Sequence, residues 1–202
     1  MGAFKLPDNP YVLLTPGPLS TTPTVKAAML RDWCTWDADY NDIVQDIRRK
    51  LVELATAGSR NEYTSVLMQG SGTFCVEAAL GTAIGAAGKI LILANGAYGE
   101  RMAVIAERLR IAHLVLRSAE TEWPDVSKIR AALSDDPSIS AVAVVHCETT
   151  TGILNPLVEI AGLVRESGRT FIVDAMSSFG GVPMDTGKLG IDFLISSANK
   201  CI

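Results

Sequence analysis

The sequence lacks the features of several protein classes. Its four cysteines, Cys34, Cys75, Cys147 and Cys201, are widely spaced without a C-x-x-C pair, which disfavours disulfides or a zinc site and favours free thiols. No apolar run approaches the roughly 18 residues that a membrane-spanning helix needs. Met1 to Lys5 does not resemble a signal peptide. We therefore expect a cytoplasmic protein with no bound metal and no membrane partner.

An excess of basic charge is also missing. The 18 Lys and Arg residues are scattered among 22 Asp and Glu residues, and the net charge is −4. Because nucleic-acid-binding proteins gather basic residues into patches, nucleic acid is disfavoured as a partner. The sequence has neither G-x-G-x-x-G nor a Walker motif, which disfavours a dinucleotide or a nucleoside triphosphate as the ligand.

Apolar residues, by contrast, are abundant. They make up 48% of the sequence and charged residues 20%, a composition that indicates a sizeable buried core. From Tyr63 onwards, short apolar runs alternate with helical patterns, which predicts an α/β fold with a doubly wound, mostly parallel sheet. We expect strands at residues 66–68, 89–94, 114–116, 140–146, 170–173 and 193–195, and helices at 74–85, 98–109, 126–133 and 156–167.

The first part of the chain has a different character. Four prolines among the first 18 residues forbid a continuous helix, so residues 1–24 are predicted to form an N-terminal arm. Its segment Leu13–Pro18 either packs on a neighbour or reaches an active-site mouth. Helices are expected at 25–30 and 40–57. The aromatic segment Arg31–Trp36 between them is interpreted as a plug in the core or at an interface, with contact to a substrate as the alternative.

An acid and an amine follow two of the predicted strands. Asp174 ends the strand at 170–173, and Lys200 comes shortly after the strand at 193–195. Because the carboxyl ends of parallel strands share one rim, where ligands bind, these groups could serve pyridoxal 5′-phosphate (PLP). A PLP site needs an amine for a Schiff base and an acid for the pyridinium nitrogen. The alternatives are a helix cap at Asp174 and an ordinary surface lysine at Lys200.

Further candidates follow other strands at this rim. The turn Gly70–Thr73 could direct backbone N–H groups at a phosphate, although glycine turns that merely cap a helix are equally common. Tyr98 could cover an aromatic ring or could pack in the structure, and Thr149 could donate to a ring oxygen. His146 is interpreted as a structural residue, and Glu148 has no partner that the sequence identifies.

The order of these signals along the chain is more specific than any one of them. The sequence resembles the class-V aminotransferases, which are PLP enzymes of fold type I, over essentially its whole length. The resemblance rests on six segments, Leu13–Pro18, Arg31–Trp36, Gln69–Thr73, Cys147–Gly152, Val173–Ser178 and Ser197–Lys200.

This resemblance implies catalytic and ring-binding roles. Lys200 would bond covalently to PLP and then carry the proton of the reaction, and Asp174 would pair with the pyridine nitrogen. Tyr98 would stack on the ring, and Thr149 would contact the ring hydroxyl.

It also implies a phosphate site and a reaction. Ser71, Gly72 and Thr73, together with Asn199, would hold the phosphate of PLP. The amino group of 2-aminoethylphosphonate would pass to pyruvate, giving phosphonoacetaldehyde and L-alanine in a step of phosphonate degradation.

The family continues well past the lysine, whereas this chain ends at Ile202. The missing part usually supplies an arginine that grips the substrate and contacts from a partner subunit. We therefore expect residues 25–202 to be the PLP-binding large domain, incomplete at its C-terminal end and truncated before the small domain. The full-length protein would be a homodimer, and the 202-residue chain alone would be inactive.

Three other functions remain open at this point. An alanine– or serine–glyoxylate aminotransferase would share most of these motifs. A cysteine desulfurase of the same fold commonly places a histidine over the ring, so Tyr98 argues against it. A non-catalytic Rossmann-like binding domain would keep the strand–helix alternation, but it would not need Asp174 and Lys200 together.

Overall fold

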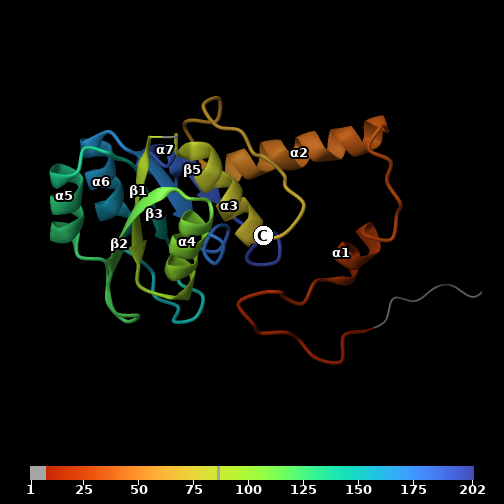
Figure 1. Cartoon of the computed structure of the whole chain (residues 1–202). Helices are drawn as coiled ribbons and strands as arrows, with labels where there is room; N and C mark the ends of the chain where they lie inside the picture. The colour runs from red at the N-terminus through yellow and green to blue at the C-terminus, as the bar shows by residue number, and fades with distance from the viewer. Residues whose placement is uncertain (1–7, 86) are drawn as a thin grey trace, which may run out of the picture.

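A single parallel sheet organises the fold. The computed structural model describes residues 8–85 and 87–202, so the first seven residues of the predicted arm lie outside it. The five strands lie in the order β2-β1-β3-β4-β5 (Figure 1), and each pairs with its neighbours in parallel. This confirms the α/β fold with a parallel sheet. The strands are β1 (Lys89–Ala94), β2 (Ala112–Arg117), β3 (Ile139–Val145), β4 (Thr170–Asp174) and β5 (Phe193–Ile195).

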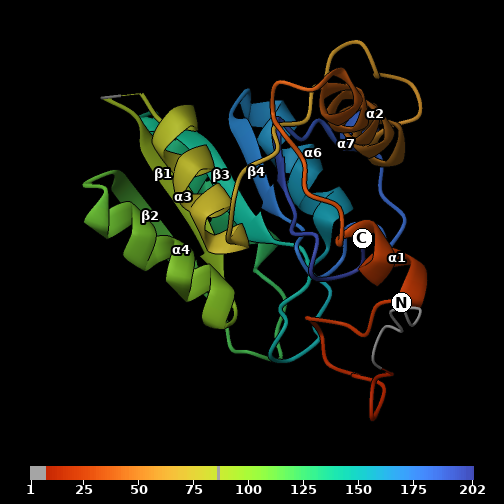
Figure 2. The ribbon, with the colours of Figure 1, turned by 90° about the vertical axis from the view of Figure 1, so that its right-hand side faces the viewer.

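Helices cover both faces of this sheet, as doubly wound topology requires. Figure 2 shows α3 and α4 on one side of the strands and α6 on the other. Ile90 and Ile92 pack with α3 and α4, whereas Leu91 and Leu93 pack with α5 and α6, because successive strand residues point to opposite faces. The helices are α3 (Gly72–Ala83), α4 (Ala97–Arg108), α5 (Val126–Asp135) and α6 (Leu157–Ser167).

The strand order reverses between β1 and β3. From β1 the chain crosses to β2 on one side and then returns to β3 on the other, where β4 and β5 follow outward. The loops after β1 and β3 therefore diverge at the carboxyl edge of the sheet. Ligands of open α/β sheets bind at such a switch point.

The strand predicted at residues 66–68 is wrong. This segment is irregular in the structure, and Val66, Leu67 and Met68 are 75%, 46% and 37% exposed. The apolar run has a strand-like composition, but among the described residues it has no neighbouring strand with which to form a hydrogen-bonded ladder. Composition alone does not supply that partner.

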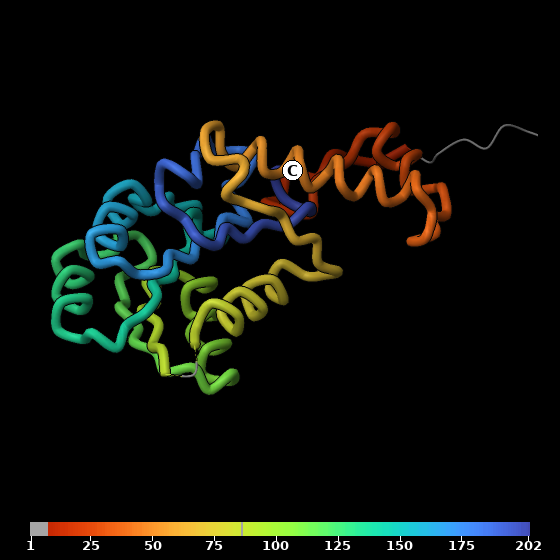
Figure 3. Tube along the Cα trace, turned by 90° about the horizontal axis from the view of Figure 1, so that it is seen from above, coloured from red at the N-terminus to blue at the C-terminus, as the bar shows by residue number. Residues whose placement is uncertain are grey.

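The N-terminal part of the chain lies beside the sheet domain. Helix α1 (Pro23–Ala28) and much of α2 (Ala38–Ala55) extend away from the strands (Figures 1 and 3), and neither contains a buried residue. Trp36 is 91% exposed and Trp33 36% exposed. A core position for the aromatic segment is therefore wrong, and its interface alternative stays a prediction. None of the described helices is long and apolar enough to cross a membrane.

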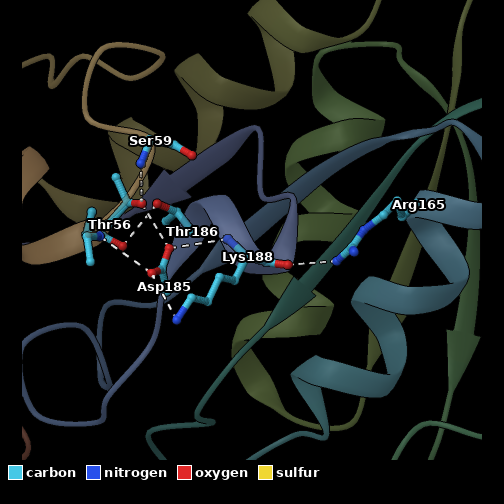
Figure 4. A network of polar contacts seen from close by, with 8 residues as sticks. Thr56, Ser59, Arg165, Asp185, Thr186 and Lys188 are labelled. Atoms are coloured by element: carbon cyan, nitrogen blue, oxygen red, sulfur yellow. Dashed lines mark hydrogen bonds and ion pairs between the residues drawn. The ribbon is translucent and has the colours of Figure 1, made fainter.

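A polar network ties the end of α2 to the sheet domain (Figure 4). The Thr56 hydroxyl donates to Asp185 Oδ1 at 2.9 Å, just before helix α7 (Thr186–Leu189). The Thr186 hydroxyl donates in turn to the carbonyl oxygen of Ala55 at 3.0 Å. These two hydrogen bonds join residues that are 129 and 131 positions apart in the sequence. They therefore fix the direction in which α2 leaves the core.

Two valines of α6, one buried and one exposed, test how much the packing of this helix on the sheet contributes to stability. Val164 is 1% exposed within the core, whereas Val158 is 74% exposed. Val164→Ala should lower the free energy of unfolding by about 2 kcal/mol, because it removes buried methyl groups and leaves a cavity. Val158→Ala, the same change on the same helix, should alter it by no more than about 0.5 kcal/mol. Urea unfolding followed by circular dichroism measures both, and equal effects would contradict the packing described.

Candidate active site

A cavity of about 390 Å³ opens at the carboxyl edge of the sheet. Its lining comes from the start of α3, the first turn of α4, and the chain at or just beyond the ends of β3, β4 and β5. The volume lies within the range of small-molecule sites. All eight residues that the sequence singled out line this one cavity, namely Ser71, Gly72, Thr73, Tyr98, Thr149, Asp174, Asn199 and Lys200.

The start of α3 forms the wall that could receive an anion. Ser71 is the N-cap residue, yet its side chain makes no capping hydrogen bond, whereas α5 is capped by the Asp125 side chain. An uncapped helix N-terminus presents free N–H groups and a partial positive charge. A Cβ atom on Gly72 would collide with Met176 Sδ, so glycine permits the close packing of α3 against the loop after β4. Together these features make a wall that could hold a phosphate.

Asp174 is a buried carboxylate at the end of β4. It is 3% exposed, and its Oδ1 accepts the Met176 backbone N–H at 3.0 Å. Burial raises the pKa of Asp174 to about 6, and the charge of Glu148 adds to this effect, while Lys200 and Arg101 oppose it. No described residue forms an ion pair with Asp174. A buried acid of this kind fits a ligand that brings its own protonated nitrogen.

Lys200 also lines the cavity, and the N-terminal segment reaches the lining beside it. Gly17 lines the cavity, and a Cβ atom on Gly17 would come within 2.6 Å of Lys200 Cδ. Of the two interpretations of Leu13–Pro18, the structure therefore supports delivery to the site mouth. Asn199 lies beside Lys200, and its side-chain oxygen accepts the Ser197 hydroxyl at 2.6 Å.

The loop after β3 contributes Thr149, whose hydroxyl shares a hydrogen bond with Ser177 Oγ. The preceding His146 is 5% exposed, and its Nδ1 lies 2.9 Å from Ser178 Oγ. Burial lowers the pKa of His146, which favours the neutral imidazole. This agrees with the structural role expected for it.

Sequence reasoning missed several residues of the lining. Arg101 is the most notable of them, because its guanidinium lies 4.9 Å from the centre of the Tyr98 ring. The spacing of three positions on a helix could have revealed this pair.

Cys147 is another lining residue that sequence reasoning missed. Burial raises the pKa of the Cys147 thiol, which disfavours a reactive thiolate. The other lining residues that were missed are Val145, Met176, Ser177 and Ser197.

The cavity lining matches the chemical features of PLP. PLP has a phosphate, an aromatic ring, a ring nitrogen that can be protonated, and an aldehyde that reacts with amines. The cavity offers an uncapped helix N-terminus, the Tyr98 ring, the buried acid Asp174 and the amine of Lys200. The residues present therefore fit the group that the sequence implied.

Comparison with known proteins points the same way. The model of the aminotransferase class-V family matches residues 23–202. The chain is 65% identical over 202 residues to a protein of Syntrophobacter fumaroxidans named 2-aminoethylphosphonate–pyruvate transaminase, covering 100% of this chain and 54% of that protein. It is 59% identical over 195 residues to a protein of the same name from Vibrio cholerae, covering 96% and 53%.

Solved structures share the fold. The crystal structure of ureidoglycine–glyoxylate aminotransferase from Bacillus subtilis aligns with a TM-score of 0.85 and 27% sequence identity, covering 98% of this chain and 50% of that one. The chain thus spans about half the length of the curated relatives and the solved structure that it matches.

The buried carboxylate of Asp174 should make the stability of the protein depend on pH. The pKa of Asp174 is about 6 when folded and near 3.8 in an unfolded chain, so the folded state binds more protons between these values. The stability of the cofactor-free protein should therefore fall as pH rises from about 4 to about 6, with a penalty of up to about 3 kcal/mol above that window.

Asp174→Asn should remove this slope and raise the free energy of unfolding at pH 7. Urea unfolding at several pH values measures it. The exposed Asp135 gives a matched control, because Asp135→Asn should leave the slope of the parent in place. A variant no more stable than the parent at pH 7 would contradict the burial penalty.

Proposed function

The chain belongs to the class-V aminotransferase family, and on that premise we propose that the protein carrying it transfers the amino group of 2-aminoethylphosphonate to pyruvate. The products are phosphonoacetaldehyde and L-alanine. The names of relatives that are 65% and 59% identical support this choice of substrates. The observation that carries the proposed chemistry is the buried carboxylate of Asp174 in the same cavity as the amine of Lys200.

Class-V aminotransferases are PLP-dependent enzymes. When bound, PLP supplies an electron sink for breaking bonds beside an amine nitrogen. The carboxylate of Asp174 would keep the ring nitrogen protonated and stabilise the positive charge there. The backbone N–H groups at the start of α3, with the hydroxyls of Ser71 and Thr73 and the amide of Asn199, would bind the phosphate.

The remaining side chains position the ring and move the proton. Tyr98 would cover one face of the bound ring, and Thr149 would donate to its hydroxyl oxygen. The amine of Lys200 would accept and return the proton of the amine substrate, which is general acid–base catalysis by a positioned group. Gly17 brings the N-terminal segment to the same mouth, where it narrows access to Lys200.

The proposal extends to the organisation of the protein. Among the described residues, those from 25 onwards belong to the large domain and residues 8–24 to an arm. Exposed apolar side chains support a homodimer at the full length of the relatives, because large exposed apolar areas are typical of interfaces. Examples are Leu14 at 91%, Met29 at 72% and Trp36 at 91% exposure. The free state of all four cysteines is consistent with the cytoplasm.

A comparison of substrates tests this function. The enzyme, prepared at the length of its curated relatives, should form L-alanine from pyruvate with 2-aminoethylphosphonate at least about a hundredfold faster than with L-serine. The reason is that a site built to bind the phosphonate dianion of this donor leaves its polar groups unpaired when a donor without a phosphonate binds. Chromatographic detection of L-alanine measures both rates. Faster amino transfer from L-alanine or L-serine to glyoxylate would replace the proposal with a glyoxylate aminotransferase.

A further inference from the structure

Glu148 is a buried acid for which the proposed chemistry has no use. Its side chain is 0% exposed, and it lies between Cys147 and Thr149, which both line the cavity. The carboxylate is directed instead at α4. Oε1 accepts the Gly99 backbone N–H at 2.9 Å, and Oε2 accepts the Tyr98 N–H at 3.2 Å.

This carboxylate caps α4 from a distant part of the sequence. The N-cap residue of α4 is Gly96, which has no side chain with which to cap the helix. A Cβ atom on Gly96 would lie 2.5 Å from Glu148 Cδ, so only glycine leaves room for the acid at this point. A carboxylate beside a helix N-terminus forms charge-assisted hydrogen bonds and is favoured by the helix dipole. Glu148 thus holds the first turn of α4 in place.

The first turn of α4 carries a wall of the cavity. Tyr98 lines the cavity and supplies one of the two N–H groups that Glu148 binds, and Arg101 lies 4.9 Å from its ring. The neighbour of Glu148 in its own loop, Thr149, lines the cavity from the β3 side. One buried carboxylate therefore connects the two walls.

We propose that Glu148 is a positioning residue that fixes the Tyr98 ring against the ring of the cofactor. The inference rests on the proposed function, because it presumes that an aromatic cofactor occupies the cavity. Glu148→Gln keeps the size of the side chain but replaces one acceptor oxygen with an NH₂ group. The NH₂ group then faces a backbone N–H, so one of the two hydrogen bonds to the first turn of α4 is lost. Tyr98 is then no longer held in its position.

The experiment measures PLP binding by the enzyme at the length of its relatives. Glu148→Gln should bind PLP about tenfold more weakly than the parent, as expected for the loss of one charge-assisted hydrogen bond. The induced circular dichroism of each bound PLP should also fall, because the ring is held less rigidly. Gly96→Ala should act in the same direction without removing the charge, because its new Cβ displaces the carboxylate.

A double-mutant cycle shows whether Glu148 acts through Tyr98. In a Tyr98→Ala background, Glu148→Gln should cause little further loss of PLP affinity, since the ring that it positions is gone. Asp185→Asn is the matched control, because Asp185 also accepts a helix N–H, that of Lys188 at 3.2 Å, but does not line the cavity. This control should leave PLP affinity unchanged.

The outcomes separate the inference from the function on which it rests. Parent-like PLP affinity and dichroism in Glu148→Gln, or an additive loss in the Tyr98→Ala background, would overturn the positioning role alone. If Glu148→Gln does not fold, parent-like PLP binding by Gly96→Ala would overturn it equally. A parent enzyme that does not bind PLP would overturn the proposed function and the inference with it.

Discussion

Parallel pairing of β3, β4 and β5 is the interaction on which the site depends. Val145 pairs with Asp174, and Asp174 pairs with Ile195, so the three strands end at the same level. The loops that follow them then face one cavity with Lys200, although these segments lie far apart in the sequence. The apolar side chains that lock this register are buried on both faces of the sheet, so the energy of the core fixes the geometry of the site.

Two buried carboxylates near this edge differ in how fully the chain satisfies them. Glu148 is satisfied within the chain, because both of its oxygens accept backbone N–H groups. Asp174 accepts one such group, and burial raises its pKa to about 6. A buried carboxylate with so few hydrogen bonds, and with no ion pair among the described residues, destabilises the fold when it is charged. It therefore favours a ligand that brings positive charge. This difference is the reason that we propose a positioning role for Glu148 and a cofactor-binding role for Asp174.

Much of the fold and site could be predicted because strands buried on both faces are continuous apolar runs. In a parallel sheet, the ends of these runs mark the rim. Glu148 could not be interpreted because backbone N–H groups carry no sequence signal. The run at residues 66–68 was misassigned because a strand needs a partner as well as a composition. The exposure of Trp36 reflects where α1 and α2 lie, which local composition does not determine.

The most direct test of the central claim is to locate the residue that bonds to the cofactor. The enzyme at the length of its relatives is loaded with PLP, reduced with borohydride and digested, and the modified peptide is identified by mass spectrometry. We expect a yellow protein with PLP fixed on Lys200, and a Lys200→Ala variant with no modified peptide. A colourless protein, or a cofactor fixed on another lysine such as the exposed Lys188, would contradict it.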